Sequence, residues 1–162
     1  MASLPSCPSL EEIQQLVSDL PAALPPIRPE PALPASVAGI IDHTLLAPSA
    51  LPADIVQCCH DAVELGAATV CVNSGAVGIA AHALKGSMVK PICTVGFPFG
   101  ASNTKGKVEE TRAAVSMGAE EIDMVQNVGL LRDGQYRQVF EDIVAVADAA
   151  RPARLKVILE TC

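Results

Sequence analysis

The chain has 162 residues, of which 50% are hydrophobic and 2% aromatic, and its formal net charge is -7. This length suits one domain with an aliphatic core, whereas a complete eight-stranded (β/α) barrel takes about 250 residues. Binding to nucleic acid or to an anionic membrane requires clustered Lys and Arg, so the acidic balance argues against both and favours a small-molecule partner.

A helix is predicted over residues 9–20, because apolar side chains recur there at the spacing of one helix face. Ser9 precedes the first of them, and Glu12 follows three residues later. This pair is typical of a capping box, in which each side chain accepts a hydrogen bond from the backbone amide of the other residue. The helix is therefore expected to begin immediately after Ser9.

A proline-rich segment follows this helix, with six prolines between residues 21 and 35. Neither a helix interior nor a central strand tolerates that density, so an extended linker is expected. We therefore predict two parts. Residues 1–36 form an N-terminal helix and proline-rich linker, and residues 37–162 form the principal domain.

From residue 38 onward, short β-branched runs alternate with polar breaks and alanine-rich helical stretches. This alternation is typical of βα units on a parallel sheet. The expected strands cover residues 39–43, 69–73, 92–96, 121–126 and 155–159. The expected helices cover residues 52–65, 76–84, 105–117 and 135–149. Pro52 suits a first helical turn, and Gly66 and Gly118 stand where a helix end favours a positive φ.

Two parallel α/β folds begin with this pattern, the open doubly wound sheet and the closed barrel. No G-x-G-x-x-G motif follows the first expected strand, which weakens the dinucleotide-binding version of the open sheet. The predicted fold class is therefore α/β, a parallel (β/α) TIM-type barrel that is truncated after about five strands.

Polar residues occur toward the C-terminal ends of the expected strands, where the active sites of parallel α/β folds gather. They are Asp42, His43, Thr44, Cys71, Asn73, Thr94, Asp123, Gln126, Asn127, Lys156, Glu160 and Thr161. Asp123 and Lys156 interrupt apolar strands, and an unpaired buried charge costs several kcal/mol. Two interpretations are open: an Asp–Lys pair that only plugs the barrel, or an acid/base carboxylate tuned by an amine, which suits carbonyl and enamine chemistry.

Asp42 and Thr44 are weaker candidates, because a carboxylate near a strand end is as often a turn former or helix cap as a catalytic group. His43 alternates with Asp42 and is expected to face the helices. The histidines His43, His60 and His82 share no common spacing, so no metal site is predicted.

The segment over residues 96–104 leads from the third expected strand into a helix. Its glycines allow a close backbone approach, and it is either a phosphate cradle or a plain capped loop. The candidates for the helix cap are Ser102, Asn103 and Thr104. Lys105 and Lys107 stand in the first helical turn, where the helix dipole disfavours cations. They hint at a contact with substrate or with a carboxylate.

The six cysteines follow no metal-ligand spacing, and several stand inside apolar runs, so buried and reduced thiols are expected. No stretch reaches the roughly 18 consecutive apolar residues of a membrane helix. The first ten residues also lack the basic start of a secretory signal. The expected location is cytoplasmic.

Five segments together resemble the deoxyribose-phosphate aldolase family, in order and at comparable spacings. They are residues 41–46 (IDHTLL), 70–73 (VCVN), 95–100 (VGFPFG), 121–129 (EIDMVQNVG) and 155–161 (LKVILET). The resemblance implies a (β/α) barrel and a class I aldolase that uses a lysine Schiff base, without a metal or other cofactor. Its substrate would be a phosphosugar, 2-deoxy-D-ribose 5-phosphate, which the family cleaves to glyceraldehyde 3-phosphate and acetaldehyde.

Residue by residue, the resemblance assigns Asp123 to the family's catalytic aspartate, which relays protons through water during carbinolamine formation and enamine protonation. It assigns Lys156 to a lysine that lines the site and supports the reaction without forming the Schiff base. Asp42, Thr44 and Cys71 match further positions that line the substrate pocket.

The chain departs from the family after Asn73, where Ser74 and Gly75 replace the usual proline, and at Gln126, where an aliphatic residue is more common. The family's nucleophilic lysine, in a Lys-Thr-Ser-Thr-Gly segment, belongs to strands beyond the fifth. Three hypotheses remain. The chain is part of such an aldolase, or a non-catalytic half-barrel that pairs with a partner chain or forms a homo-oligomer, or a different phosphosugar barrel enzyme.

Overall fold

The computed structural model describes residues 8–18 and 37–161, and these contain one sheet of five parallel strands in the order β1-β2-β3-β4-β5. The strands are β1 (Asp42–Leu45), β2 (Thr69–Asn73), β3 (Lys90–Val95), β4 (Glu121–Val125) and β5 (Arg154–Ile158). The helices are α1 (Leu10–Ser18), α2 (Pro52–Leu65), α3 (Val77–Ala83), α4 (Thr104–Ser116), α5 (Val128–Arg132) and α6 (Tyr136–Ala150), and the 3₁₀ turns are η1 (Val37–Ile40) and η2 (Ser74–Ala76). Each strand pairs with the next in chain order, without the reversal of a doubly wound sheet, which confirms the barrel-type α/β fold.

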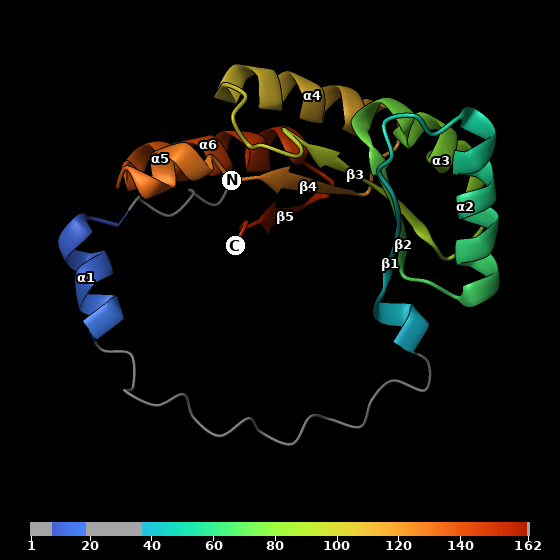
Figure 1. Cartoon of the computed structure of the whole chain (residues 1–162), viewed down its shortest axis with the longest axis horizontal. Coiled ribbons are helices and arrows are strands. Elements are labelled where there is room, and N and C mark those ends of the chain that lie inside the picture. Colours follow the sequence, from blue (N-terminus) through green and yellow to red (C-terminus); the bar gives the residue numbers. More distant parts are fainter. Residues whose placement is uncertain (1–7, 19–36, 162) are drawn as a thin grey trace.

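The helices that connect the strands lie along one side of the sheet, as Figure 1 shows. Successive strand residues point to opposite faces, so every second side chain faces these helices. The core between sheet and helices includes Val70, Val72, Cys93, Val95, Ile122 and Met124 from the strands and Cys59, Ala62, Ala80, Ala114 and Val146 from the helices. The other set of strand side chains faces away from the helices and includes the polar residues discussed below.

Most element boundaries agree with the sequence-based expectation to within two residues, and α2 and β2 agree fully. Pro52 is the first residue of α2, and Gly66 and Gly118 have φ angles of 69° and 105°, as their positions predicted. The short helix α5 was not predicted. It is capped by Asn127, whose Oδ1 accepts a hydrogen bond from the Leu130 amide at 3.1 Å.

The predicted first strand was placed too early. The apolar run before it forms η1, in which the Ile41 amide donates to the Ala38 carbonyl at 3.0 Å. The strand begins at Asp42, where pairing with Thr69 of β2 begins. Apolar character alone does not distinguish a 3₁₀ turn from a strand, and η1 contains no buried residue. Asp42 is therefore the first residue of its strand and does not lie at the C-terminal end.

The capping box at the start of α1 is present. The Ser9 amide donates to Glu12 Oε2 at 2.6 Å, and the Glu12 amide donates to Ser9 Oγ at 3.2 Å. The expected end of this helix at residue 20 and the whole proline-rich segment lie outside the described residues. The division into residues 1–36 and 37–162 stays a prediction.

Two expectations about membranes and thiols concern the described part of the chain. Among residues 8–18 and 37–161, no helix has the length and apolar character needed to span a bilayer. The thiols of Cys58, Cys59, Cys71 and Cys93 are free and buried, in line with reduced cysteines. Cys7 and Cys162 lie outside the described residues.

The loop between β3 and α4 folds over the end of β4. Gly96 and Gly100 both have φ angles of 64°, and the Gly100 amide donates to the Gly96 carbonyl at 2.8 Å. A Cβ atom at Gly100 would lie 2.0 Å from the Gln126 carbonyl oxygen. Asn103 caps α4, because its Oδ1 accepts from the Gly106 amide at 2.8 Å. The predicted helix cap is therefore present at Asn103, and the phosphate cradle stays an open alternative.

The Gly100→Ala variant is expected to lose about 3 kcal/mol or more of unfolding free energy, since it combines left-handed backbone strain with a clash against backbone. Gly134→Ala is the matched control, because Gly134 has a φ of 74° but open space around its Cβ position. It isolates the strain and should cost about 1 kcal/mol. Urea denaturation compares the two variants, and equal losses would contradict the close approach at Gly100.

Candidate active site

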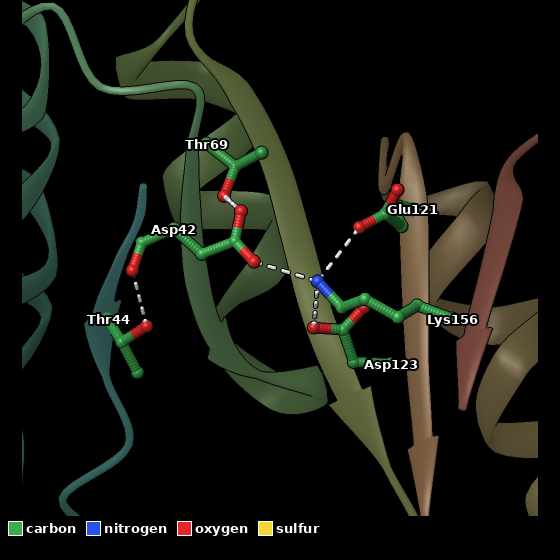
Figure 2. Close-up of polar contacts among 6 residues, drawn as sticks. All are labelled: Asp42, Thr44, Thr69, Glu121, Asp123 and Lys156. Atoms are coloured by element: carbon green, nitrogen blue, oxygen red, sulfur yellow. Dashed lines mark hydrogen bonds and ion pairs between the residues drawn. The ribbon is translucent and has the colours of Figure 1, made fainter. Parts of the chain in front are cut away.

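Four ionisable side chains meet on the face of the sheet that the helices leave uncovered (Figure 2). Lys156 Nζ lies 2.7 Å from Asp42 Oδ2 and 3.0 Å from Asp123 Oδ2. The same nitrogen lies 3.1 Å from Glu121 Oε1. The ammonium group therefore has a carboxylate partner for each of its three N–H bonds.

The contact between Lys156 and Asp42 joins the two ends of the sheet, β5 and β1. Asp123 and Lys156 are direct neighbours in the β4–β5 register, so their contact is local. Asp42, by contrast, lies on β1, at the far end of the strand order. The two side chains can meet only if the sheet curls toward this face, as the inner face of a barrel does.

The cluster lies within the strands and not on the rim that the sequence suggested. Asp123 and Lys156 are each the third residue of a five-residue strand, and Asp42 is the first residue of β1. The expected convergence at the C-terminal ends of the strands is therefore wrong for these three residues. They converge on the inner face of the curled sheet.

Asp42 is held as an anion by two donors. Besides Lys156 at its Oδ2, it accepts a hydrogen bond at Oδ1 from the Thr69 hydroxyl at 2.7 Å. Burial raises the pKa of Asp42, but the hydrogen bonds from Lys156 and Thr69 outweigh burial and leave the pKa below its ordinary value. Asp42 is thus a fixed negative charge beside the ammonium group.

Asp123 has a pKa that is shifted in the opposite direction from that of Asp42. Its side chain is 7% exposed, and its Oδ1 is buried without a hydrogen-bond partner. Burial raises the pKa of Asp123 above its ordinary value, although the hydrogen bond from Lys156 lowers it. Two carboxyl groups that contact the same lysine therefore have pKa values shifted in opposite directions. This pattern is typical of sites where one carboxyl group carries a proton and the other stays ionised.

Lys156 is held as a cation. Burial lowers the pKa of Lys156, but the hydrogen bonds to Asp42, Asp123 and Glu121 outweigh burial and raise the pKa above its ordinary value. A protonated amine has no lone pair with which to attack a carbonyl group, so Lys156 is unsuited to act as a nucleophile. The three carboxylates could also surround a metal ion, but the Lys156 nitrogen lies where that ion would sit.

Cys71 and Thr44, which the sequence also suggested as site residues, lie in the described part of the chain but form no hydrogen bond or ion pair with the Lys156 ammonium group. Cys71 is buried, and burial together with the charge of Asp123 raises the pKa of its thiol to about 12, so the thiol is neutral near pH 7. Thr44 turns away from the cluster, since its hydroxyl donates to the backbone carbonyl of Asp42 at 2.8 Å. The structure does not bring Thr44 to the ammonium group.

Glu121 and Thr69 belong to the cluster but were not selected from the sequence. Glu121 precedes Asp123 by two residues on the same strand, so both side chains project from the same face. That alternation was the available signal for Glu121. Thr69 begins β2 directly opposite Asp42. Its role depends on the observed β1 boundary, which the sequence misplaced.

The chain is similar to known aldolases in sequence and in structure. Residues 37–162 match the family described as DeoC/LacD family aldolase. Deoxyribose-phosphate aldolases from two strains of Clostridium perfringens are each 48% identical over 127 residues, which are 78% of this chain and 57% of theirs. The chain thus spans a little over half the length of these relatives.

Solved structures give the same similarity. The provisionally assigned deoxyribose-phosphate aldolase of Coccidioides immitis superposes with a TM-score of 0.83 at 44% identity, over 93% of this chain and 61% of that chain. The deoxyribose phosphate aldolase of Aeropyrum pernix, described as tetrameric, has a TM-score of 0.69 at 26% identity, over 76% of this chain and 52% of that chain.

Proposed function

Because the chain belongs to the DeoC/LacD aldolase family, we propose that it serves in the cleavage of 2-deoxy-D-ribose 5-phosphate to glyceraldehyde 3-phosphate and acetaldehyde. The reaction is a class I aldolase reaction, in which a lysine Schiff base withdraws electrons from the bond that breaks. The substrate is a small phosphosugar, as the family resemblance implies.

The observation that carries this proposal is the state of Asp123. It is a buried carboxyl group with a raised pKa, one oxygen on an ammonium group and the other without a partner. A free carboxyl oxygen on the inner face can exchange a proton with a water molecule or a substrate hydroxyl. General acid–base catalysis requires such a group with a pKa moved toward the working pH.

The proposed roles follow from the two carboxylates and the lysine. Asp123 gives a proton to the hydroxyl that leaves the carbinolamine as water. The resulting carboxylate takes a proton, through water, from the substrate hydroxyl as the carbon–carbon bond breaks into aldehyde and enamine, and then gives this proton, through water, to the carbon of the enamine. The positive charge of Lys156 stabilises the Asp123 carboxylate whenever Asp123 has given up its proton. Asp42 keeps that charge in place by accepting a hydrogen bond from Lys156 at 2.7 Å.

The Schiff-base lysine is proposed to be a residue other than Lys156, in the part of the relatives that this chain does not span. Lys156 is held charged by three carboxylates, and Lys107 is fully buried in an ion pair with Asp142. Neither offers a free, neutral amine to a substrate carbonyl.

Borohydride trapping tests this assignment. The chain is incubated with 2-deoxy-D-ribose 5-phosphate and borohydride, which reduces a Schiff base to a stable amine, and its peptides are mapped by mass spectrometry. We expect no adduct at Lys156. The Clostridium perfringens aldolase serves as the positive control and should be labelled. An adduct at Lys156 in this chain would make it the nucleophile and overturn the supporting role.

A second candidate function is that of a half-barrel that acts only with a partner. In the described part of the chain, β1 and β5 each pair with one strand only, so both sheet edges are unpaired. Ile40, Ile41 and Leu159 near these edges are exposed. Unpaired edges with apolar surface favour association, either with a second copy or with a complementary half-barrel. Light scattering after size exclusion separates a monomer from a homo-oligomer.

We also propose a cytoplasmic location. The four described cysteines are free and buried, which suits a reducing compartment. Localisation of a tagged chain by fluorescence microscopy tests this proposal.

A further inference from the structure

Helix α4 carries a buried lysine whose charge the proposed reaction does not use. The Lys107 side chain has no exposed surface, and its Nζ donates to Asp142 Oδ2 at 2.7 Å and to the Val125 carbonyl at 3.0 Å. Asp142 lies on α6, and Val125 is the last residue of β4. This one amine therefore ties α4 and α6 to the end of the strand that carries Asp123.

Glu110 lies one turn further along α4 and accepts hydrogen bonds from the residues that follow β2 and β3. Its Oε1 accepts a hydrogen bond from the Ser74 hydroxyl at 2.6 Å, and its Oε2 accepts one from the Gly96 amide at 3.0 Å. Ser74 directly follows β2, and Gly96 directly follows β3. Residues three apart on a helix share a face, so Lys107 and Glu110 act on the same edge of the sheet.

Close packing joins these two sets of contacts. A Cβ atom at Gly96 would lie 3.1 Å from Lys107 Cε, so the backbone after β3 rests on the lysine stem. Four residues later, Gly100 packs against the Gln126 carbonyl, just beyond the end of β4. The C-terminal ends of β2, β3 and β4 are thus held together by two side chains of one helix.

A buried ion pair fixes a helix only at the cost of removing two charges from water. Apolar side chains of similar volume often stabilise a core equally well, so a buried pair is weak evidence for stability as such. Lys107 instead supplies a donor to the Val125 carbonyl at the point where the sheet ladder ends, and a buried carbonyl needs a partner. An apolar residue could not replace that hydrogen bond.

We propose that Lys107 and Glu110 are positioning residues, which fix the ends of β2, β3 and β4 so that Asp123 stays buried against Lys156 on the inner face. Val125 follows Asp123 by two residues on the same strand, so release of its carbonyl frees the end of β4 and admits water to Asp123. The consequence for catalysis rests on the proposed function, whereas the fixing of the strand ends does not.

The test uses the double variant Lys107→Met/Asp142→Leu of this chain, which removes both charges and leaves neither one buried alone. The pH titration of the Asp123 carboxyl carbon is followed by ¹³C NMR. We expect its midpoint to fall by about half a unit or more, toward the ordinary aspartate value near 3.9. The other groups that face Asp123, namely Asp42, Cys71, Glu121 and Lys156, are unchanged in this variant.

Val146→Ala is the matched control, because Val146 is a fully buried residue of α6 in the core between sheet and helices. It loosens the same helix but leaves the hydrogen bonds of Lys107 and Glu110 at the strand ends in place, so its Asp123 midpoint should equal that of the wild type. A wild-type midpoint in the folded double variant overturns the proposal. An equal shift in Val146→Ala also overturns it, since general loosening would then suffice.

A second pair of variants tests Glu110 if the double variant does not fold. Glu110→Gln retains an acceptor for the Gly96 amide, whereas Glu110→Ala removes it. Hydrogen exchange of that amide should be about tenfold faster in the alanine variant than in the glutamine variant. Equal exchange rates overturn the proposal for Glu110. None of these measurements needs aldolase activity, so an inactive chain with the expected shifts contradicts only the proposed function.

Discussion

The Asp123→Asn variant is expected to lose turnover by about 10²- to 10⁴-fold, the usual contribution of a general acid–base group. Asparagine has the same shape and keeps an acceptor for Lys156, but it cannot carry a proton. The assay uses a chimera in which the 127 matching residues of this chain replace those of the Clostridium perfringens aldolase. Acetaldehyde release from 2-deoxy-D-ribose 5-phosphate is measured.

Glu121→Gln is the control, since it makes the same chemical change at another carboxylate on the same nitrogen. Its loss of turnover should be much smaller, because Glu121 is more exposed than Asp123, at 22% against 7%, and is assigned no proton transfer. Normal turnover in Asp123→Asn would support the other interpretation, in which Asp123 and Lys156 form a pair that only fills the barrel.

The stability of Asp123→Asn should follow from the raised pKa of Asp123. An acid whose pKa is higher in the folded state loses stability as the pH rises from the unfolded value, near 3.9, through the folded value. The neutral asparagine avoids that loss. We therefore expect the variant to be at least as stable as the wild type at pH 7, with the difference shrinking below about pH 4. Urea denaturation at the two pH values measures this, and the opposite trend would contradict the raised pKa.

The sequence predicted the fold well where local patterns decide it. The strand Thr69–Asn73 and the helix Pro52–Leu65 agree fully with the expected ranges, because a β-branched run and a helix with Pro at its start are local features. The predicted start of β1 was wrong, because the true start depends on where β1 pairs with β2. The five-residue helix α5 was missed, because five residues are too few to show a helical period.

The candidate site was predictable only in part. Asp123 and Lys156 were conspicuous as charges inside apolar strands. Glu121 begins its strand, where a charged residue is ordinary, so its two-residue spacing from Asp123 was the one signal that marked it. The contact of Lys156 with Asp42 spans 114 residues and two non-adjacent strands. It follows from the curl of the sheet, which the residue pattern does not specify.

In the first turn of α4, too, the sequence indicated a contact but not its distant partner. The position of Lys107 in a first helical turn correctly hinted at a carboxylate contact, because the helix dipole alone disfavours a cation there. The partner, Asp142, could not be identified, since it lies on a different helix 35 residues away. Gln126 stands where an aliphatic residue is more common in the family. In the structure its side-chain amide donates to the Leu159 carbonyl, which links the ends of β4 and β5.

The Lys156→Met variant is expected to be destabilised by about 2 kcal/mol or more at pH 7, because it leaves three carboxylates together without a counter-ion. A fully buried pair would lose more, but the Lys156 side chain is 43% exposed and solvent screens part of the repulsion. Lys90→Met is the matched control. Its ion pair with Glu120 is longer, at 3.4 Å, and both side chains are about half exposed, so its loss should stay below about 1 kcal/mol.

The pH dependence of this loss distinguishes charge from packing. The lowered pKa of Asp42 means that its stabilisation is present above the unfolded value near 3.9 and is lost as the pH falls through the folded value. The raised pKa of Lys156 means that its own stabilisation is lost only as the pH rises through a value above its ordinary one. Between these limits the difference between wild type and Lys156→Met should be largest, and it should shrink in acid as the carboxylates become protonated. Urea denaturation from pH 3 to pH 8 measures the difference, and a pH-independent loss would mean that Lys156 stabilises the sheet through its aliphatic stem and not through its charge.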